Sequence, residues 1–189
     1  MTASSATSPH FLFLAASTRD PGITGNTEWL ARRAAQSLAP EVEQTWLSVP
    51  AMPVPPFVDR RHTVGEYPMP EGDLRRLLDA MLAATDIVFV SPVYWYSIPA
   101  PLKAFIDHWS AFLRVPGLDF KARMAAKSLR LVTTSGDRPK AQPSIDSIRL
   151  CAEFMGMRWG GELWGKGGAP GAVANDEAAC EAALSFLAK

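Results

Sequence analysis

Short uninterrupted apolar runs alternate along this chain with longer stretches in which apolar residues recur every three or four positions. The runs at 11–16 (FLFLAA) and 86–91 (DIVFVS) are typical of buried strands in a parallel sheet, and 128–133 (SLRLVT) gives a further strand. The run at 43–49 (EQTWLSV) is more polar, which favours the edge of a sheet, and 158–164 (RWGGELW) gives a weaker strand signal. We therefore expect a sheet of five strands.

The stretches between these strands carry helical periodicity. Apolar positions at helical spacing predict helices at 27–39 (ended by Pro40), 71–84, about 101–113, 144–155 and 176–188. The connection 50–70 differs, because its prolines forbid regular structure. A connection of this length inside a domain is usually a functional lid or a partner surface.

Strands that alternate with helices predict an α/β fold with right-handed crossovers and a parallel sheet that has helices on both faces. Five strands fit a three-layer sandwich of the flavodoxin type, in the spatial order 2-1-3-4-5. The strand order reverses between the first and third strands, so the loops that leave their carboxyl ends are expected to form the ligand site.

Length and composition bound the interpretation. The chain has 189 residues, of which 48% are hydrophobic, and this is enough for one well-buried core. We expect a disordered polar lead at 1–9 and a single domain at 10–189. Lys and Arg together number 19, as do Asp and Glu, so no positive field attracts nucleic acid. Small molecules or other protein chains are the expected partners.

The cysteines and histidines carry no sign of a metal site. Cys151 and Cys180 lie in two different predicted helices, without metal-ligand spacing, and are expected to be buried thiols. His10, His62 and His108 are likewise scattered. Few cysteines suit a reducing compartment, and no segment is long enough to span a bilayer, so a cytoplasmic protein is expected.

The loop after the first strand is rich in groups that bind anions. It leads into a helix N-terminus, where free backbone N–H groups and the helix dipole favour a negative charge. Simple capping by Thr24 or Asn26 is the alternative, because polar loops before helices are common. Neither a dinucleotide fingerprint nor a nucleoside-triphosphate loop is present. The candidate phosphate-binding residues are Ser17, Arg19, Thr24, Gly25, Asn26 and Thr27.

The loop after the third strand combines rigidity with flat surface. Prolines restrict its backbone, and its aromatic and apolar side chains stand beside exposed peptide N–H groups, an arrangement that suits one edge and face of a planar heteroaromatic ring. The alternative is that these aromatics pack on a neighbouring element or a second subunit. The candidate ring-binding residues are Pro92, Val93, Tyr94, Trp95 and Tyr96.

A third candidate loop, Thr134, Ser135, Gly136 and Asp137, follows the fourth strand. Its small residues would let the backbone approach the polar edge of the ring and donate a hydrogen bond. Asp137 could orient a substrate, although its position is typical of a turn-forming residue.

Two of these segments resemble one known family. The segment 91–109 (SPVYWYSIPAPLKAFIDHW) resembles the signature of the NADPH-dependent FMN reductases, whose members read close to SP-x-Y-x-x-S-x-P-x-x-L-K-x-F-x-D. STRDPGITGNT resembles their phosphate loop, and Ser17, Arg19, Asn26 and Thr27 are the matching positions. The stretch between Arg19 and Asn26 is longer than usual, so whether Arg19 reaches the phosphate is a question for the structure.

The resemblance implies a flavin enzyme. FMN would be bound non-covalently, reduced by NADPH or NADH, and reoxidised by a small acceptor such as a quinone, a nitro or azo aromatic, or free flavin. Hydride transfer needs two aligned rings more than a titrating side chain, so we nominate no catalytic residue. The alternatives are a flavodoxin-like electron carrier, which would need an acidic docking face, and a flavin-free binding protein on the same fold.

The helix after the signature resembles the region through which the family dimerises. Its face formed by Lys103, Phe105, Ile106 and Trp109 is therefore a candidate contact for a homodimer or a dimer of dimers, and Lys103 is also spaced to pair with Asp107. Arg130 and Lys140 are expected to be ordinary surface charges.

Overall fold

The computed structural model describes residues 8–188 and contains a parallel sheet whose strand order is β2-β1-β3-β4-β5. Both the order and the direction of the strands confirm the predicted topology, including the edge position of the polar second strand. The predicted lead at 1–9 falls mostly outside the described residues. The strands are β1 (His10–Ala15), β2 (Glu43–Ser48), β3 (Asp86–Val90), β4 (Ser128–Ser135) and β5 (Arg158–Lys166).

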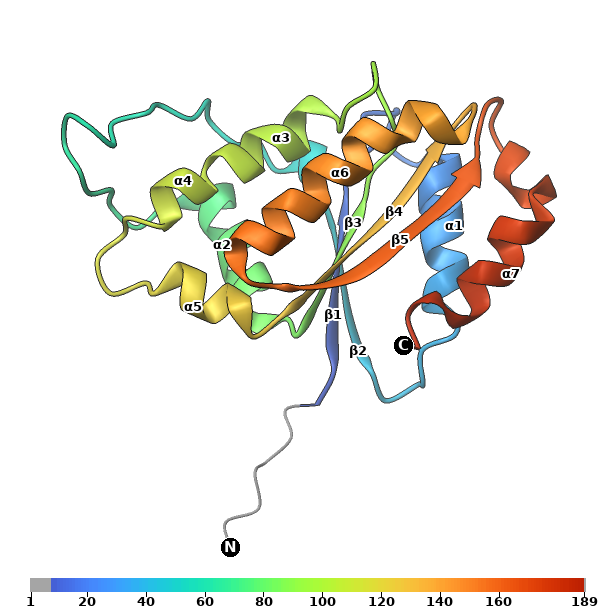
Figure 1. Cartoon of the computed structure of the whole chain (residues 1–189), viewed down its shortest axis with the longest axis horizontal. Coiled ribbons are helices and arrows are strands. Elements are labelled where there is room, and N and C mark those ends of the chain that lie inside the picture. Colours follow the sequence, from blue (N-terminus) through green and yellow to red (C-terminus); the bar gives the residue numbers. More distant parts are fainter. Residues whose placement is uncertain (1–7, 189) are drawn as a thin grey trace, which may run out of the picture.

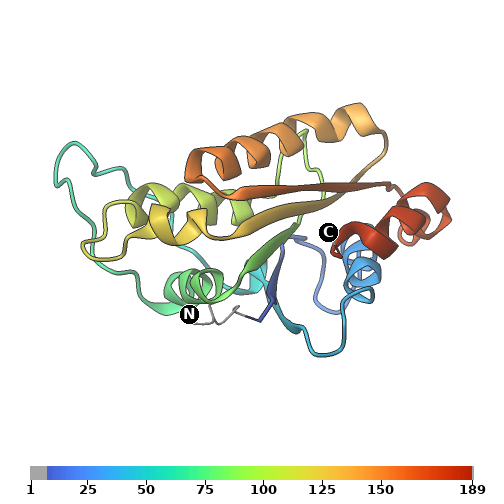
Figure 2. The same cartoon turned by 60° about the horizontal axis from the view of Figure 1, so that its bottom comes forward.

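Helices cover the two faces of this sheet unequally (Figures 1 and 2). One face carries α1 (Asn26–Ala35) and α7 (Glu177–Phe186), which pack side by side. Two short 3₁₀ helices, η1 (Val49–Ala51) and η2 (Ala172–Asn175), follow β2 and precede α7. The other face carries α2 (Gly72–Ala83), α3 (Ala100–Asp107), α4 (Trp109–Phe112), α5 (Phe120–Ala125) and α6 (Arg138–Met155).

Alternation along the strands divides the core into two. On β1, Leu12 and Leu14 pack toward the face with five helices, whereas Phe11 and Phe13 pack toward α1 and α7. Successive side chains of a strand point to opposite faces, and all four are at least 96% buried. The uninterrupted apolar run FLFLAA in the sequence therefore corresponds to a strand that is covered on both faces.

Several predicted boundaries were wrong. The single helix expected at 101–113 is divided at His108 into α3 and α4. The helix expected at 144–155 begins already at Arg138, because Pro139 lies in the first turn, where its missing N–H costs nothing. Helix α5 was not predicted at all. The fourth and fifth strands continue to Ser135 and Lys166, while the first helix ends at Ala35, before Pro40.

Arg130 is not a surface charge, as the sequence suggested, but is 1% exposed near the amino end of β4. Its Nη1 donates to Asp86 Oδ1 at 2.7 Å and to Ser128 Oγ at 2.8 Å. Gly160 on β5 leaves room for it, since a Cβ there would lie 2.5 Å from Arg130 Cγ. Asp86 and Ser128 are also hydrogen-bonded to each other, so the three side chains form one polar network, which Thr85 and Arg158 join through Asp86.

The connection between β2 and α2 runs outward beyond α3 and α4 (Figure 1). Apart from η1 it has no regular structure, as predicted. Aromatic and polar contacts tie it to the body of the protein: the Phe57 ring meets His108 edge to face, with 5.6 Å between ring centroids, and His108 Nε2 donates to Pro55 O at 2.8 Å. Residues 8–188 contain no helix long and apolar enough to cross a membrane.

Candidate functional site

A cavity of about 230 Å³ lies where the carboxyl ends of β1, β3 and β4 meet. In Figure 1 these strand ends point toward the upper edge of the molecule. The cavity joins residues from all three predicted loops, as the strand order requires. Its lining consists of Ser17, Arg19, Gly25, Asn26, Thr27, Glu28, Pro92, Val93, Tyr94, Thr134, Ser135, Gly136, Gly167 and Gly168.

One end of the cavity is the N-terminus of α1. Gly25 is the N-cap, and no side chain caps the helix, so capping by Thr24 or Asn26 is wrong. Uncapped N–H groups in the first turn, together with the helix dipole, form a site for an anion. Thr24 is exposed and is absent from the cavity lining.

Arg19 reaches this end despite the lengthened loop. Its side chain lies over Gly25, where a built Cβ would be 3.2 Å from Arg19 Nε. This close approach places the guanidinium next to the helix N-terminus, and a larger residue at 25 would have to displace it by a few tenths of an ångström. Ser17 Oγ supports the turn by accepting from the backbone N–H of Arg19 at 3.5 Å.

The side chains of Asn26 and Thr27 are engaged with other parts of the protein. Asn26 is 6% exposed, and its Nδ2 donates to Ala169 O at 3.0 Å. The hydroxyls of Thr27 and Thr134 are 2.5 Å apart and link α1 to β4. Both residues line the cavity, but what they present to an anion from this helix terminus is chiefly their backbone N–H groups.

The loop after β3 forms a tight turn at the other end of the cavity. Tyr94 and Ser97 exchange two backbone hydrogen bonds of 2.9 and 3.0 Å, and the two residues between them have positive φ angles, 50° for Trp95 and 63° for Tyr96. This is the arrangement of a type I′ hairpin, which normally selects Asn and Gly. Two aromatic residues here strain the backbone, and such strain is concentrated at functional sites.

Only part of this aromatic group faces the cavity. Pro92, Val93 and Tyr94 line it, whereas Trp95 is 94% exposed and Tyr96 is 55% exposed. Burial raises the pKa of Tyr94, but hydrogen bonds to Thr18 and Ser17 and the charge of Arg19 outweigh it, so the net pKa is lowered. The Tyr94 hydroxyl thus joins the third-strand loop to the phosphate loop.

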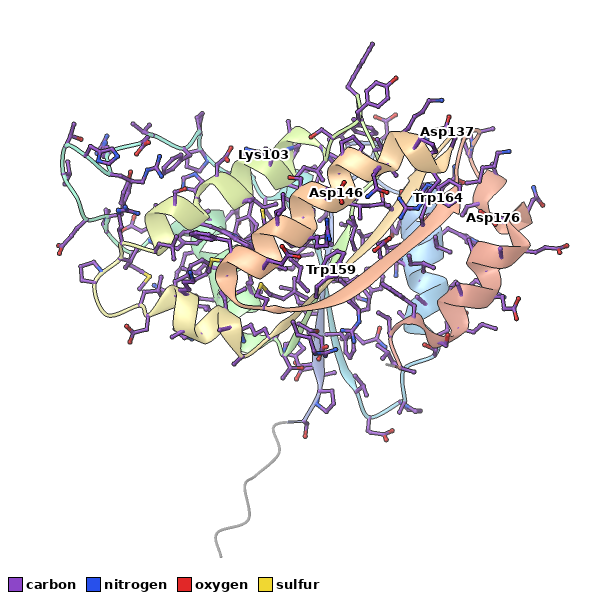
Figure 3. All side chains as sticks on the ribbon, viewed as in Figure 1. Lys103, Asp137, Asp146, Trp159, Trp164 and Asp176 are labelled. Carbon is purple, nitrogen blue, oxygen red and sulfur yellow. The ribbon has the colours of Figure 1, made fainter. Side chains whose placement is uncertain are left out.

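The third wall is the end of β4. Thr134 and Ser135 belong to the strand and not to a loop, and Gly136 follows them. Asp137 lies outside the lining; it caps α6 by accepting from Lys140 N at 3.1 Å and pairs with Lys140 Nζ at 2.7 Å. Figure 3 shows Asp137 at the start of α6, beside the strand ends.

Sequence reasoning missed Glu28, Gly167 and Gly168. The two glycines follow β5, and Gly167 N–H donates to Ser135 O at 2.8 Å, which extends the sheet contact into the cavity wall. The signal was present in the sequence as a glycine pair after the fifth strand. The carboxyl-end rule does not single out this pair, because it points first to the loops beside the reversal of strand order.

The sequence matches the family model described as NADPH-dependent FMN reductase over residues 9–167. A protein of Bacillus subtilis (strain 168), YwqN, named as an NAD(P)H-dependent FMN-containing oxidoreductase, is 34% identical over 166 residues. That alignment covers 86% of this chain and 90% of YwqN.

Solved structures share the fold. The Trp repressor binding protein from Bacillus subtilis has a TM-score of 0.71 and 28% identity, and the alignment covers 94% of this chain and 96% of that one. An FMN-dependent NADH-azoreductase from Bacillus anthracis str. Ames Ancestor, solved in complex with FMN, has a TM-score of 0.65 and 14% identity, with coverage of 96% and 100%.

Proposed function

Because the chain belongs to the NADPH-dependent FMN reductase family, we propose that it binds FMN in the cavity described above and passes electrons from NAD(P)H to a small planar acceptor. The protein is an NAD(P)H-dependent oxidoreductase with FMN as its cofactor. The position of FMN, the residues that hold it and the class of acceptor are our proposals.

The N-terminus of α1 would bind the phosphate. Backbone N–H groups of its first turn supply hydrogen bonds, and Arg19 supplies the opposite charge. Ser17 adds a hydroxyl at the same end. An uncapped helix terminus with the Arg19 guanidinium beside its N-cap, Gly25, fits a bound dianion, and this observation carries the proposal.

The ring would lie between the loops after β3 and β4. Pro92 and Val93 present apolar surface, and Gly136 leaves the backbone accessible to the polar edge of a ring. When bound, FMN supplies the hydride chemistry, accepting two electrons from a nicotinamide and giving them to a second substrate. The residues of the chain align the rings, and none needs to titrate.

A second hollow offers space for the rest of a nicotinamide nucleotide. It has a volume of about 630 Å³ and adjoins the cavity through Ser17, Arg19 and Glu28. On its far wall the Arg32 guanidinium lies 4.5 Å above the Trp46 ring. The acceptor would approach the exposed side of the ring near Trp95, where flat molecules such as quinones, nitro or azo aromatics, or free flavin can stack.

An anaerobic reductive titration tests this function. Protein loaded with FMN should lose its yellow colour on addition of NADPH or NADH, and each acceptor in a panel should restore the colour at its own rate. A flavin that neither nicotinamide bleaches would overturn the proposed turnover. A protein that retains no flavin on a desalting column would overturn the proposed site.

We also propose that the protein forms a homodimer, alone or as half of a tetramer. The predicted contact face needs correction, because Phe105 is 0% and Trp109 is 5% exposed within their own core. The groove between α3, α4 and α6 is the better candidate. Figure 3 labels Lys103 and Asp146 on the helices that border it, and it has a volume of about 620 Å³.

A second copy suits this groove by apolarity and charge. Leu150 and Phe154 on α6 are 58% and 62% exposed. Large apolar side chains exposed together on a groove often mark an interaction surface. Each border carries one pair of opposite charges, Lys103 with Asp107 and Asp146 with Arg149, so two copies related by a two-fold axis can match them. Sedimentation should show a dimer that Leu150→Glu weakens; a strict monomer would contradict it.

A cytoplasmic location remains part of the proposal. Cys151 and Cys180 are free thiols in helices α6 and α7, which suits a reducing compartment. Both are half-buried, so the expectation of fully buried thiols was wrong. Fractionation of cells that make the protein would test the location.

A further inference from the structure

The side chain of Asn26 is directed away from the role that the sequence suggested for it. The amide is buried at 6% exposure, its Nδ2 donates to Ala169 O at 3.0 Å, and its Oδ1 accepts from Val173 N at 3.4 Å. Both bonds go to one segment more than 140 positions away in the chain. A buried amide that is engaged at both ends holds its partners in place, because breaking either bond leaves a desolvated polar group.

The segment that Asn26 holds, 167–173, comprises the loop between β5 and η2 and the first two residues of η2, and we call it the C-terminal loop. Its first residue approaches β4 so closely that a Cβ on Gly167 would lie 3.1 Å from Thr134 Cβ and 3.5 Å from Asn26 Nδ2. Gly167 and Gly168 line the cavity. Almost all of the C-terminal loop lies beyond the stretch matched by the family model, which ends at 167.

We propose that Asn26 is a positioning residue that clamps the C-terminal loop against the cavity, and that this loop controls how fast FMN leaves. The inference rests on the proposed position of FMN. Asn26 contributes its backbone N–H to the anion site, while its side chain acts only through Ala169 and Val173. Loss of the clamp frees the loop to move off the cavity and opens a path for the flavin.

The first test replaces the amide with an apolar side chain of similar size. In Asn26→Leu, release of FMN from the full-length protein should accelerate about tenfold, the effect of losing roughly one net hydrogen bond. Riboflavin, which lacks the phosphate, should be released faster by a similar factor. If FMN release accelerates and riboflavin release does not, Asn26 is a phosphate ligand and the proposal is overturned.

A second variant disturbs the same loop from the opposite side. Gly167→Ala places a methyl group against Thr134 and pushes the loop outward without removing any polar group. If Asn26 acts through the loop, the double variant should release FMN hardly faster than either single variant, because both changes remove one interaction. Multiplied effects would show two independent contributions and would contradict the clamp.

Asn175→Leu is the matched control. It is the same substitution in η2, at an exposed residue that lies outside the cavity, and it should leave FMN release unchanged.

Amide hydrogen exchange provides a readout that global destabilisation would not reproduce. In Asn26→Leu, exchange should accelerate at Val173 and its neighbours, while the amides of β1 and β3 keep their protection.

The exchange measurement also separates this inference from the proposed function. It can be made on protein that has lost its flavin, so faster exchange confined to 168–173 supports the clamp by itself. Unchanged exchange at Val173 would refute the clamp even if FMN binds as proposed. A wild-type protein that binds no FMN would instead refute the proposed site, and the role of the loop in flavin release with it.

Discussion

The amino and carboxyl ends of strands β3 and β4 differ in how their polar groups are bonded. At their amino ends, Asp86, Ser128 and Arg130 are joined in one largely buried polar network. At their carboxyl ends, the strands lead into a cavity beside the N-terminus of α1, whose first-turn N–H groups no side chain caps. Polar groups bonded within the protein serve stability, whereas backbone N–H groups left for a ligand serve function.

The backbone repeats this contrast. At the amino ends β3 and β4 pair in regular register, with Asp86 opposite Ser128, and the register shift there lies on the β5 side of β4, between Leu129 and Leu131. At the carboxyl end of β3 the chain enters a turn whose central residues, Trp95 and Tyr96, both have positive φ. Left-handed backbone costs a non-glycine residue about 1–2 kcal/mol. The strain in this turn therefore lowers the stability of the fold, and stabilising contacts elsewhere must offset it.

The largest expected effect comes from breaking the amino-end network. Arg130→Ala leaves the largely buried carboxylate of Asp86 with only the exposed Arg158, 3.6 Å away, as a cation. Removal of one partner of a buried ion pair typically costs about 3–5 kcal/mol of unfolding free energy. Urea unfolding followed by circular dichroism measures the loss. FMN affinity, measured on the folded protein, should change little, since the network lies at the opposite end of the strands.

The matched control is a surface pair with the same 2.7 Å separation. Arg75 and Asp79 form it on α2, where both side chains are largely exposed. Arg75→Ala should cost no more than about 1 kcal/mol. If both arginine variants lose the same stability, burial does not distinguish the two pairs, and the contrast between the ends of the sheet loses its energetic basis.

The topology could be predicted from the sequence because the buried strands appear in it as apolar runs. FLFLAA and DIVFVS have no polar face, which only a doubly covered strand tolerates, and the alternation with helices then leaves few arrangements. The boundaries failed where local signals compete. The helix expected from Ser144 begins at Arg138, and it contains Pro139 in its opening turn and Pro143 in its interior.

The FMN-binding residues remain a prediction, but the loops that carry them meet at one cavity, whereas two side-chain environments could not be foreseen. The carboxyl-end rule placed Ser17, Tyr94 and Gly136 on one cavity without knowledge of any contact. It could not reveal that Asn26 is bonded to Val173, nor that Arg130 is buried, because each depends on a residue that is distant in the chain. These pairings exist only once the sheet has formed.

A smaller effect, of opposite sign, is expected at the carboxyl end. Replacing Trp95 by Asn and Tyr96 by Gly gives the turn the residues that its backbone prefers. Relief of the strain should raise the unfolding free energy by about 1–2 kcal/mol. The same variant should turn over planar acceptors more slowly, because the aromatic surface beside the proposed ring site is gone. Thermal unfolding and steady-state rates measure the two changes; lower stability would show that the aromatics contribute packing that outweighs the strain.

The smallest effect is a change in the response of stability to acid. Burial raises the pKa of Asp86, but hydrogen bonds from Ser128, Arg130 and Thr85 and the charge of Arg130 outweigh it, so the folded-state pKa lies below its usual value. A carboxyl group with a depressed pKa contributes its full stabilisation above its unfolded pKa of about 3.9 and loses it as the pH falls through the folded value.

Asp86→Asn removes this titration. The variant is less stable at neutral pH, but its unfolding free energy should fall less steeply than that of the wild type below about pH 4. Urea unfolding at a series of pH values measures the slope, and Asp79→Asn, at the exposed pair on α2, serves as the control. If the acid slopes of wild type and Asp86→Asn are parallel, the acid sensitivity originates elsewhere. A flatter slope in Asp86→Asn alone would show that acid destabilises the protein through the network at the amino ends. The carboxylate that pairs with Arg130 would then be the group that gains a proton on unfolding.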